Sequence, residues 1–163
     1  MQKMSLADLI NKMQTNWPQA VNPETEAILG IIRLNDVVRS TSDPIIADHD
    51  LTHTEFEVLT ALRAMPEPRE LTPTELYSSL LVTSGGMTKV LKNLEERGFI
   101  ERRLSGGDGR SKPVRLTNTG ARIIEKTMAA VVQGDRNLLS RSLSKEDTKR
   151  LRHILLQGLE KLE

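Results

Sequence analysis

The chain has 163 residues, a net charge of +1 and 37% hydrophobic residues, enough for one domain with a core or for a small domain plus an oligomerisation element. It contains no cysteine, which excludes disulfides, thiolate metal sites and thiol chemistry, and its 2% aromatic content disfavours base stacking on exposed rings but leaves double-stranded DNA open. Because there is neither an apolar run of about 18 residues nor a signal-peptide pattern, we expect a soluble, cytoplasmic protein.

A long early helix is expected to begin after Asn22, because Pro23 and Glu24 are typical of a first helical turn. Pro44 should kink or end this helix. The helix carries an aliphatic stripe made of Ile28, Ile31, Ile32 and Val38.

Two shorter helices have matching start signals. In "LTHTEF" (51–56), Thr52 stands at the N-cap and Glu55 follows three residues later, which is a capping box. "LTPTEL" (71–76) repeats the pattern with Thr72 and Glu75, and places a proline at the first helical position. We therefore expect helices beginning at about residues 53 and 73.

The next helix is amphipathic. In "SGGMTKVLKNLEERG" (84–98) apolar residues recur at helical spacing, and Gly98 stands where a left-handed C-terminal cap belongs. Gly85 and Gly86 either loosen the helix start or let the backbone approach a phosphate. The expected buried face contains Met87, Val90, Leu91 and Leu94, and the expected exposed face contains Thr88, Lys89, Lys92, Asn93 and Glu96.

A hairpin follows, with strands "FIERRL" (99–104) and "KPVRLT" (112–117) joined by the glycine-rich "SGGDGRS". With the turn "LLVTS" (80–84), residues 53–117 therefore read as a helix-turn-helix followed by a β-wing. A phosphate cradle of the Walker or dinucleotide type needs a helix after the glycines, whereas this loop lies between two strands. We expect no enzyme site and no cofactor there.

The charge is unevenly distributed along the chain. Between Ser84 and Arg115 there are eight basic and four acidic residues, a net +4, which leaves −3 for the remainder. This pattern is typical of a polyanion-binding segment, and the alternative is a mixed solvated surface.

The last helix is expected to begin after Ser144 in "LSKED". A winged helix of about 65 residues does not cover all of the aliphatic stripes by itself, so we expect a second subunit to cover them; packing on the same domain is the alternative. The stripes of the two C-terminal helices contain Ile124, Met128, Val131, Leu138, Leu151, Ile154, Leu155, Leu159 and Leu162.

The stretch "ADHDLTH" (47–53) contains enough donors for a metal ion. Its spacing crosses a helix start, so His49 and His53 need not share a face, and no second cluster completes a site. Solvated loop charges are the expected interpretation, and we predict no metal site.

Three stretches resemble the MarR family of bacterial transcription regulators: "LTHTEFEVLTAL", "LTPTELYSSLLVTSGGMTKVLKNLEERGFIERR" and "GDGRSKPVRLTNTG". The resemblance includes the wing residues Asp108 and Arg110 and the L-T-x-x-G that opens the following helix. It implies a homodimer with each recognition helix in a major groove and each wing at an adjacent minor groove. Arg110 would enter that groove, oriented by Asp108; the alternative is a surface arginine paired with Asp108.

The stretch "LADLINKMQTNW", ending at Trp17, resembles the extra helix of the PecS-like, urate-responsive branch of that family. Two positions depart from the branch's ligand pattern: Glu57 stands where aspartate is usual, and Val90 where an arginine is expected. The helix is therefore shared without urate being implied. Trp17 is either a core or interface anchor or a ligand contact, and the candidate ligand pocket consists of Trp17, Arg33 and Glu57.

These observations predict a mainly α (α+β) fold with a winged helix-turn-helix domain at 51–117. An extra helix and a dimerisation helix (1–50) precede it, and dimerisation helices (118–163) follow. The expected function is that of a homodimeric repressor that binds an inverted-repeat operator in double-stranded DNA and is released by a small, anionic, aromatic effector. The alternative is a protein-interaction module without specific DNA binding, whose basic wing meets an acidic partner. The residues predicted to contact DNA are Thr72, Thr74, Ser84, Gly85, Gly86, Thr88, Lys89, Lys92, Asn93, Arg102, Asp108, Arg110 and Lys112.

Overall fold

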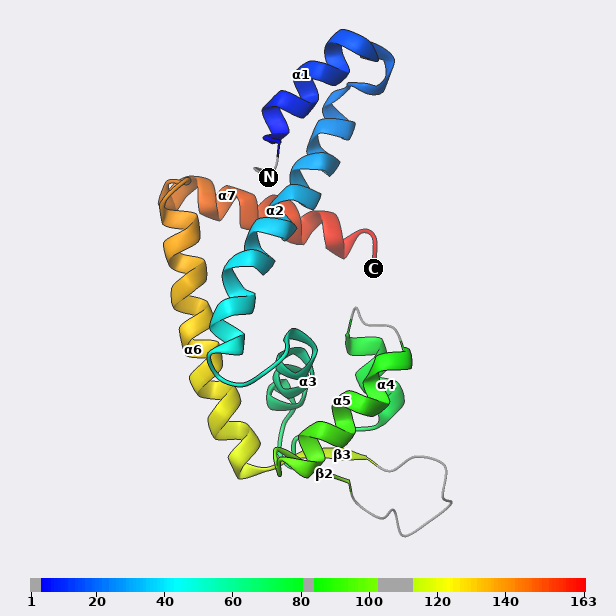
Figure 1. Cartoon of the computed structure of the whole chain (residues 1–163), viewed down its shortest axis with the longest axis vertical. Coiled ribbons are helices and arrows are strands. Elements are labelled where there is room, and N and C mark those ends of the chain that lie inside the picture. Colours follow the sequence, from blue (N-terminus) through cyan, green and yellow to red (C-terminus); the bar gives the residue numbers. More distant parts are fainter. Residues whose placement is uncertain (1–3, 81–83, 103–112) are drawn as a thin grey trace. The chain divides into compact units, whose positions relative to one another are not determined.

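The computed structural model describes residues 4–80, 84–102 and 113–163, and it consists of helices and one small antiparallel sheet (Figure 1). The chain divides into two compact units, Met1–Thr41 and Ser42–Glu163. The order of elements in the second unit confirms the predicted α+β winged helix-turn-helix fold. Within the described ranges, no helix is long and apolar enough to cross a membrane.

The first unit contains α1 (Leu6–Asn16), the 3-10 turn η1 (Pro18–Ala20) and most of α2 (Pro23–Ala47). The Ser5 hydroxyl caps α1 by accepting the Asp8 N–H at 3.0 Å, and Trp17 closes the helix, so the predicted extra helix is present. Arg33 Nη2 donates to the Met4 carbonyl at 3.1 Å, which ties the start of α1 to α2.

The long helix α2 begins where the sequence predicts, with Asn22 Oδ1 accepting the Thr25 N–H at 2.8 Å. The expectation that Pro44 could end it is wrong, because the helix continues to Ala47. The last turn is held by packing and hydrogen bonding. The Ile46 side chain is only 1% exposed in the core, and the Asp48 N–H donates to the Pro44 carbonyl at 2.9 Å.

Both predicted capping boxes are confirmed, at the starts of α3 (His53–Ala64) and α4 (Pro73–Ser79). The Thr52 N–H donates to Glu55 Oε2 at 2.8 Å, and the Glu55 N–H donates back to Thr52 Oγ1 at 3.3 Å. At α4 the corresponding distances between Thr72 and Glu75 are 2.7 and 3.3 Å.

Helix α5 (Ser84–Glu96) buries Met87, Leu91 and Leu94, which are at most 3% exposed. Val90, predicted on the same face, is only half-buried and lies at the edge of the stripe. The left-handed cap is confirmed, because Gly98 has φ +70° and the Phe99 N–H donates to the Leu94 carbonyl at 2.9 Å.

The wing begins with β2 (Ile100–Arg102), which pairs antiparallel with β3 (Val114–Leu116), as predicted. A third strand, β1 (Glu70–Leu71), pairs with the other edge of β3 in the order β1-β3-β2. The sequence did not predict β1, because two residues are too few for an alternating pattern. The sheet therefore links the segment before α4 to the base of the wing.

Helix α6 (Asn118–Ser140) leaves β3 and packs against α3, and α7 (Lys145–Glu160) follows with the predicted Ser144 cap (Figure 1). Ile124 and Val131 on α6 are 1% and 7% exposed, so the chain's own core covers them and no partner is needed for these two residues. Other aliphatic residues of the terminal helices are exposed, with Ile154 at 66% and Ile28 at 57%. A further set is half-buried: Val38, Met128, Leu138 and Leu151.

Candidate nucleic-acid interface

The exposed face of α5 brings together much of the predicted DNA-contact set. Because Met87, Leu91 and Leu94 anchor the opposite face, Thr88 and Lys89 lie on the surface. Gly86, Lys92 and Asn93 are exposed as well. Ser84 and Gly85 are the first two residues of this helix. The face is cationic at Lys89 and Lys92, and the Lys92 Nζ lies 3.6 Å from Glu96 Oε1. Both partners of that pair are exposed, so it holds Lys92 only weakly.

The start of α4 supplies two further predicted residues. Thr74 is exposed, whereas the Thr72 hydroxyl is occupied by the capping box: it donates to Glu75 Oε2 at 2.7 Å and accepts the Glu75 N–H. Hydrogen bonds from the Thr72 backbone and then from its hydroxyl lower the pKa of the Glu75 carboxyl from its usual 4.5. Thr72 thus has a structural partner in addition to its predicted DNA role.

At the base of the wing, Arg102 Nε lies 3.2 Å from Glu95 Oε2, an ion pair that joins β2 to α5. Arg102 was predicted to contact DNA, and the structure gives it this link to the recognition helix. The other predicted wing residues, Asp108, Arg110 and Lys112, lie outside the described residues.

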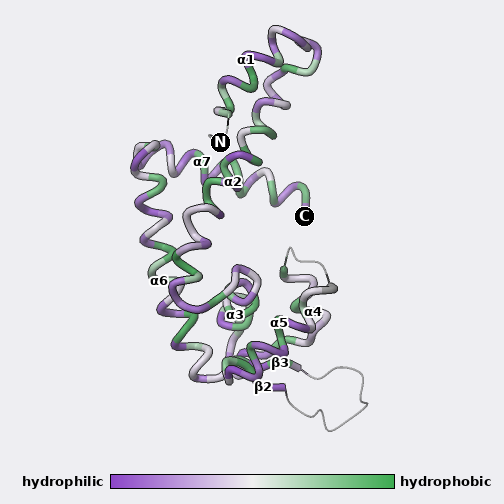
Figure 2. Tube along the Cα trace, viewed as in Figure 1, coloured by the Kyte–Doolittle hydropathy of each residue, from purple (hydrophilic) through white to green (hydrophobic). Residues whose placement is uncertain are grey.

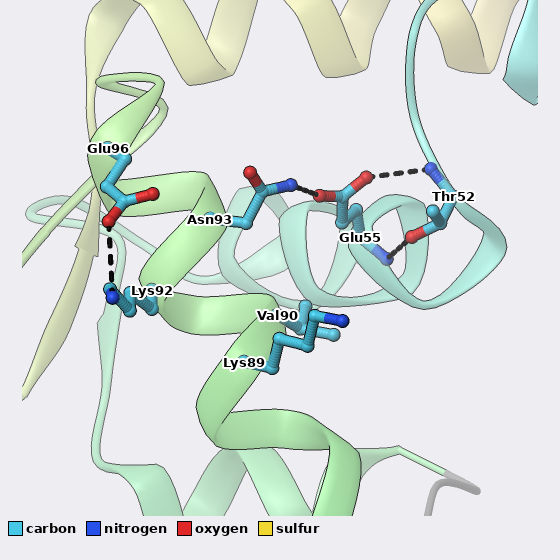
Figure 3. Close-up of a pocket in the computed structure, with 7 residues that line it drawn as sticks. All are labelled: Thr52, Glu55, Lys89, Val90, Lys92, Asn93 and Glu96. Atoms are coloured by element: carbon cyan, nitrogen blue, oxygen red, sulfur yellow. Dashed lines mark hydrogen bonds and ion pairs between the residues drawn. The ribbon is translucent and has the colours of Figure 1, made fainter.

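A hollow beside α5 is lined by residues of both α5 and the start of α3: Thr52, Glu55, Lys89, Val90, Lys92, Asn93 and Glu96. Figure 3 shows the Asn93 amide pointing toward the Glu55 carboxylate, to which it donates a hydrogen bond. Arg97 Nη1 lies 3.5 Å from the same Glu55 oxygen, although the Glu55 side chain is only 3% exposed. Sequence reasoning assigned Glu55 only to a helix cap and missed this second set of partners. The sequence feature that could have indicated these partners is Asn93, a polar residue three positions after Val90, which lies at the edge of the buried stripe.

The candidate ligand residues stay a prediction. Trp17, at the end of α1, is 64% exposed, and Arg33 bonds the Met4 carbonyl in the same unit. Glu57, in the second unit, lies with its Oε1 3.3 Å from His53 Nε2.

The histidines near the start of α3 have separate partners. His49 Nδ1 lies 2.9 Å from the Ile45 carbonyl, whereas His53 lies between Asp43, at 2.7 Å, and Glu57. Among the described residues, no group of three side chains is arranged to hold a metal ion. The separation follows from the helix start, which directs the two imidazoles to different neighbours.

A family model and individual relatives both place this chain among the same regulators. A sequence model described as the MarR family matches residues 49–111. The multiple antibiotic resistance protein MarR of Escherichia coli is 30% identical over 136 residues, which cover 81% of this chain and 92% of that protein. The transcriptional regulator PecS of Dickeya dadantii is 25% identical over 153 residues, covering 93% of this chain and 91% of PecS.

Solved structures share the fold. A MarR family transcriptional regulator from Streptomyces coelicolor, in complex with DNA, aligns with a TM-score of 0.73 at 23% identity and covers 88% of this chain and 91% of its own. The regulator NadR, in complex with 4-hydroxyphenylacetate, aligns with a TM-score of 0.64 at 22% identity, covering 83% and 92%.

Proposed function

Since the chain belongs to the MarR family and is a DNA-binding transcriptional regulator, we propose that it acts as a homodimeric repressor of an inverted-repeat operator and is released by a small effector. The observation that carries the proposal is the exposed polar face of α5. Its buried face is fixed in the core, so the backbone of Thr88, Lys89 and Lys92 is held in place while their side chains are exposed and available to DNA.

The recognition helix α5 enters a major groove, which accommodates an α-helix and displays a distinct pattern of donors and acceptors for each base pair. Lys89 and Lys92 bind phosphates, and Thr88 faces the base edges. The start of α4 adds Thr72 and Thr74, and the start of α5 adds Ser84, Gly85 and Gly86. In the wing, Arg110 enters the adjacent minor groove, Asp108 orients it, and Lys112 and Arg102 add positive charge. A MarR family regulator from Streptomyces coelicolor with this fold is known in complex with DNA, which supports DNA binding by the same fold here.

Dimerisation is supported by the aliphatic residues that the chain leaves exposed. Hydrophobic and hydrophilic segments alternate along α2 and α7 (Figure 2), and burying each large aliphatic side chain stabilises by about 1.5–3 kcal/mol. A second copy that covers these residues forms a two-fold interface, so residues 1–50 and 118–163 act as the dimerisation regions around the DNA-binding domain at 51–117. The exposed residues include Ile28, Ile31, Ile32, Ile154, Leu155, Leu156, Leu159 and Leu162.

The effector is a small anionic aromatic compound. NadR, with 4-hydroxyphenylacetate bound, is a structural neighbour that supports this class of ligand. Trp17, Arg33 and Glu57 are the proposed ligand contacts: an indole stacks on an aromatic ring, and a guanidinium pairs with an anion. Release from DNA requires that the effector bind more tightly to the conformation that does not fit the operator.

Selection from a randomised duplex pool, followed by footprinting, tests the proposal. A homodimer should protect an inverted repeat whose half-sites are centred about one helical turn apart. Protection of a single half-site by a monomer contradicts the dimer, and equal affinity for selected and scrambled duplexes favours a winged-helix module that binds an acidic protein instead.

A further inference from the structure

Glu55 is a buried carboxylate with partners on two helices. Its Oε2 accepts the Thr52 N–H at 2.8 Å, within its own capping box. Its Oε1 accepts a hydrogen bond from the Asn93 amide and lies 3.5 Å from Arg97 Nη1, 38 and 42 residues away in sequence. One side chain thus joins the start of α3 to the recognition helix.

Helix capping does not require this burial. Glu75 occupies the same position of an equivalent capping box, where it accepts hydrogen bonds from the backbone and hydroxyl of Thr72, and it stays exposed. A carboxylate that loses water is destabilising unless it is paired and hydrogen-bonded. Glu55 is compensated by donors from Thr52, Asn93 and Arg97, so its position depends on α5 being present in this orientation.

Asn93 and Arg97 contact Glu55 from different positions along the axis of α5. Asn93 lies within the helix and points toward Glu55 of α3 (Figure 3), whereas Arg97 directly follows the last residue of the helix. Arg97 is itself held, because its Nη2 donates to the Asp50 carbonyl at 2.6 Å and its guanidinium lies 4.7 Å from the centre of the Phe99 ring. Contacts at two heights restrict both the tilt of α5 and its rotation about its own axis.

Rotation is the motion to which base recognition is most sensitive. Side-chain tips lie about 5 Å from a helix axis, so a rotation of about 10° moves them by about 1 Å. A displacement of that size takes a hydrogen bond out of its normal range, whereas a long lysine still reaches a phosphate. Losing the rotational restraint should therefore reduce discrimination between sequences more than it reduces overall DNA affinity.

We propose that Glu55 is the positioning residue of the recognition helix: through Asn93 and Arg97 it sets the rotation of α5 and thereby the sequence specificity of DNA binding, without contacting DNA itself. The inference rests on the proposed function. It also changes the role of Asn93, whose amide serves Glu55 rather than a base edge.

The experiment measures the affinity of each variant for two duplexes of equal length at the same salt concentration. One duplex is selected by the wild-type protein from a randomised pool, and the other has a scrambled sequence. Glu55→Ala should lower the ratio of the two affinities by at least about tenfold, the effect of one misread base pair. Affinity for the scrambled duplex should stay within about twofold, because the cations of α5 remain. Glu55→Gln, which keeps an acceptor for Asn93 but loses the charge beside Arg97, should lose less.

Glu125→Gln is the matched control. Glu125 Oε1 pairs with Arg63 Nε at 2.7 Å, so this variant also removes a carboxylate–arginine contact of α3, but one directed to α6. It should leave the affinity ratio unchanged. Asn93→Ala should reproduce the loss in the wild-type background and add little to Glu55→Ala, since the two residues form one contact.

Unchanged ratios in both Glu55→Gln and Asn93→Ala overturn the proposal, and these two variants decide it if Glu55→Ala does not fold. It is also overturned if the losses from Asn93→Ala and Glu55→Ala add in full, because Asn93 then reads DNA independently. A wild-type protein that prefers no selected duplex refutes the proposed function, and the positioning role with it. If the wild-type protein does select a duplex but the variants keep its affinity ratio, only the role of Glu55 is refuted.

Discussion

The backbone carbonyl of Phe99 lies where a side chain on Gly120 would have to stand. A Cβ atom built on Gly120 overlaps that oxygen and comes within 2.8 Å of Leu116 Cδ1. Thr117 closes the same junction, since its hydroxyl caps α6 by accepting the Gly120 N–H at 3.0 Å and donates to the Gly98 carbonyl at 2.7 Å. The L-T-x-x-G pattern therefore joins the end of the recognition helix, the wing and α6 at one point.

Gly120→Ala should destabilise the protein by about 2–4 kcal/mol, because the clash is with backbone that cannot rotate away. Thermal unfolding followed by circular dichroism measures the change. Gly158→Ala is the control, since the Gly158 position in α7 has open space around it and alanine favours a helix by up to about 1 kcal/mol. Equal melting temperatures for the two variants would show that the junction relaxes.

Local signals explain what could be predicted from the sequence. A capping box acts within four residues, so Thr52 and Thr72 mark the starts of α3 and α4 correctly. The buried stripe of α5 follows from helical spacing alone, apart from Val90, which lies at the edge of the stripe where burial depends on the neighbouring helix.

Non-local pairing explains what could not. Strand β1 exists because Glu70 and Leu71 pair with Arg115 and Val114, more than forty residues later. The hydrogen bond between Asn93 and Glu55 likewise joins residues that are far apart in the sequence. The spacing of aliphatic residues likewise does not predict which stripe is buried in the chain's own core: Ile124 is buried, whereas Ile154 is exposed.

Lys89→Ala should weaken DNA binding and reduce the slope of log K against log salt by about 1, as expected for the loss of one phosphate contact. Fluorescence anisotropy with a selected duplex at several salt concentrations gives the slope. Lys126→Ala, which removes an exposed cation from α6, should leave it unchanged. A slope equal to that of the wild type would mean that Lys89 does not bind a phosphate.

Arg110→Ala should abolish most sequence-specific binding while the dimer stays intact, because the glycine-rich loop offers no other guanidinium to enter a narrow minor groove. Electrophoretic mobility shifts measure binding, and sedimentation measures the dimer. Arg110→Lys keeps the charge but not the planar fork, so it should restore only part of the affinity. Full specific affinity in Arg110→Ala would remove the wing from the mechanism.

Release from DNA should respond to a ligand and not to oxidants. The chain has no cysteine, and methionine oxidation is a slower and less selective reaction than thiol oxidation, so binding to the selected duplex should survive millimolar peroxide. A phenolic acid or a purine should raise the melting temperature of the free protein and weaken its DNA binding, since a ligand stabilises the conformation that it binds. Trp17→Ala should abolish both responses while leaving DNA affinity within about twofold, because Trp17 is not among the residues proposed to contact DNA. If peroxide releases the protein while no compound of either class shifts the melting temperature or the DNA affinity, the effector hypothesis is wrong.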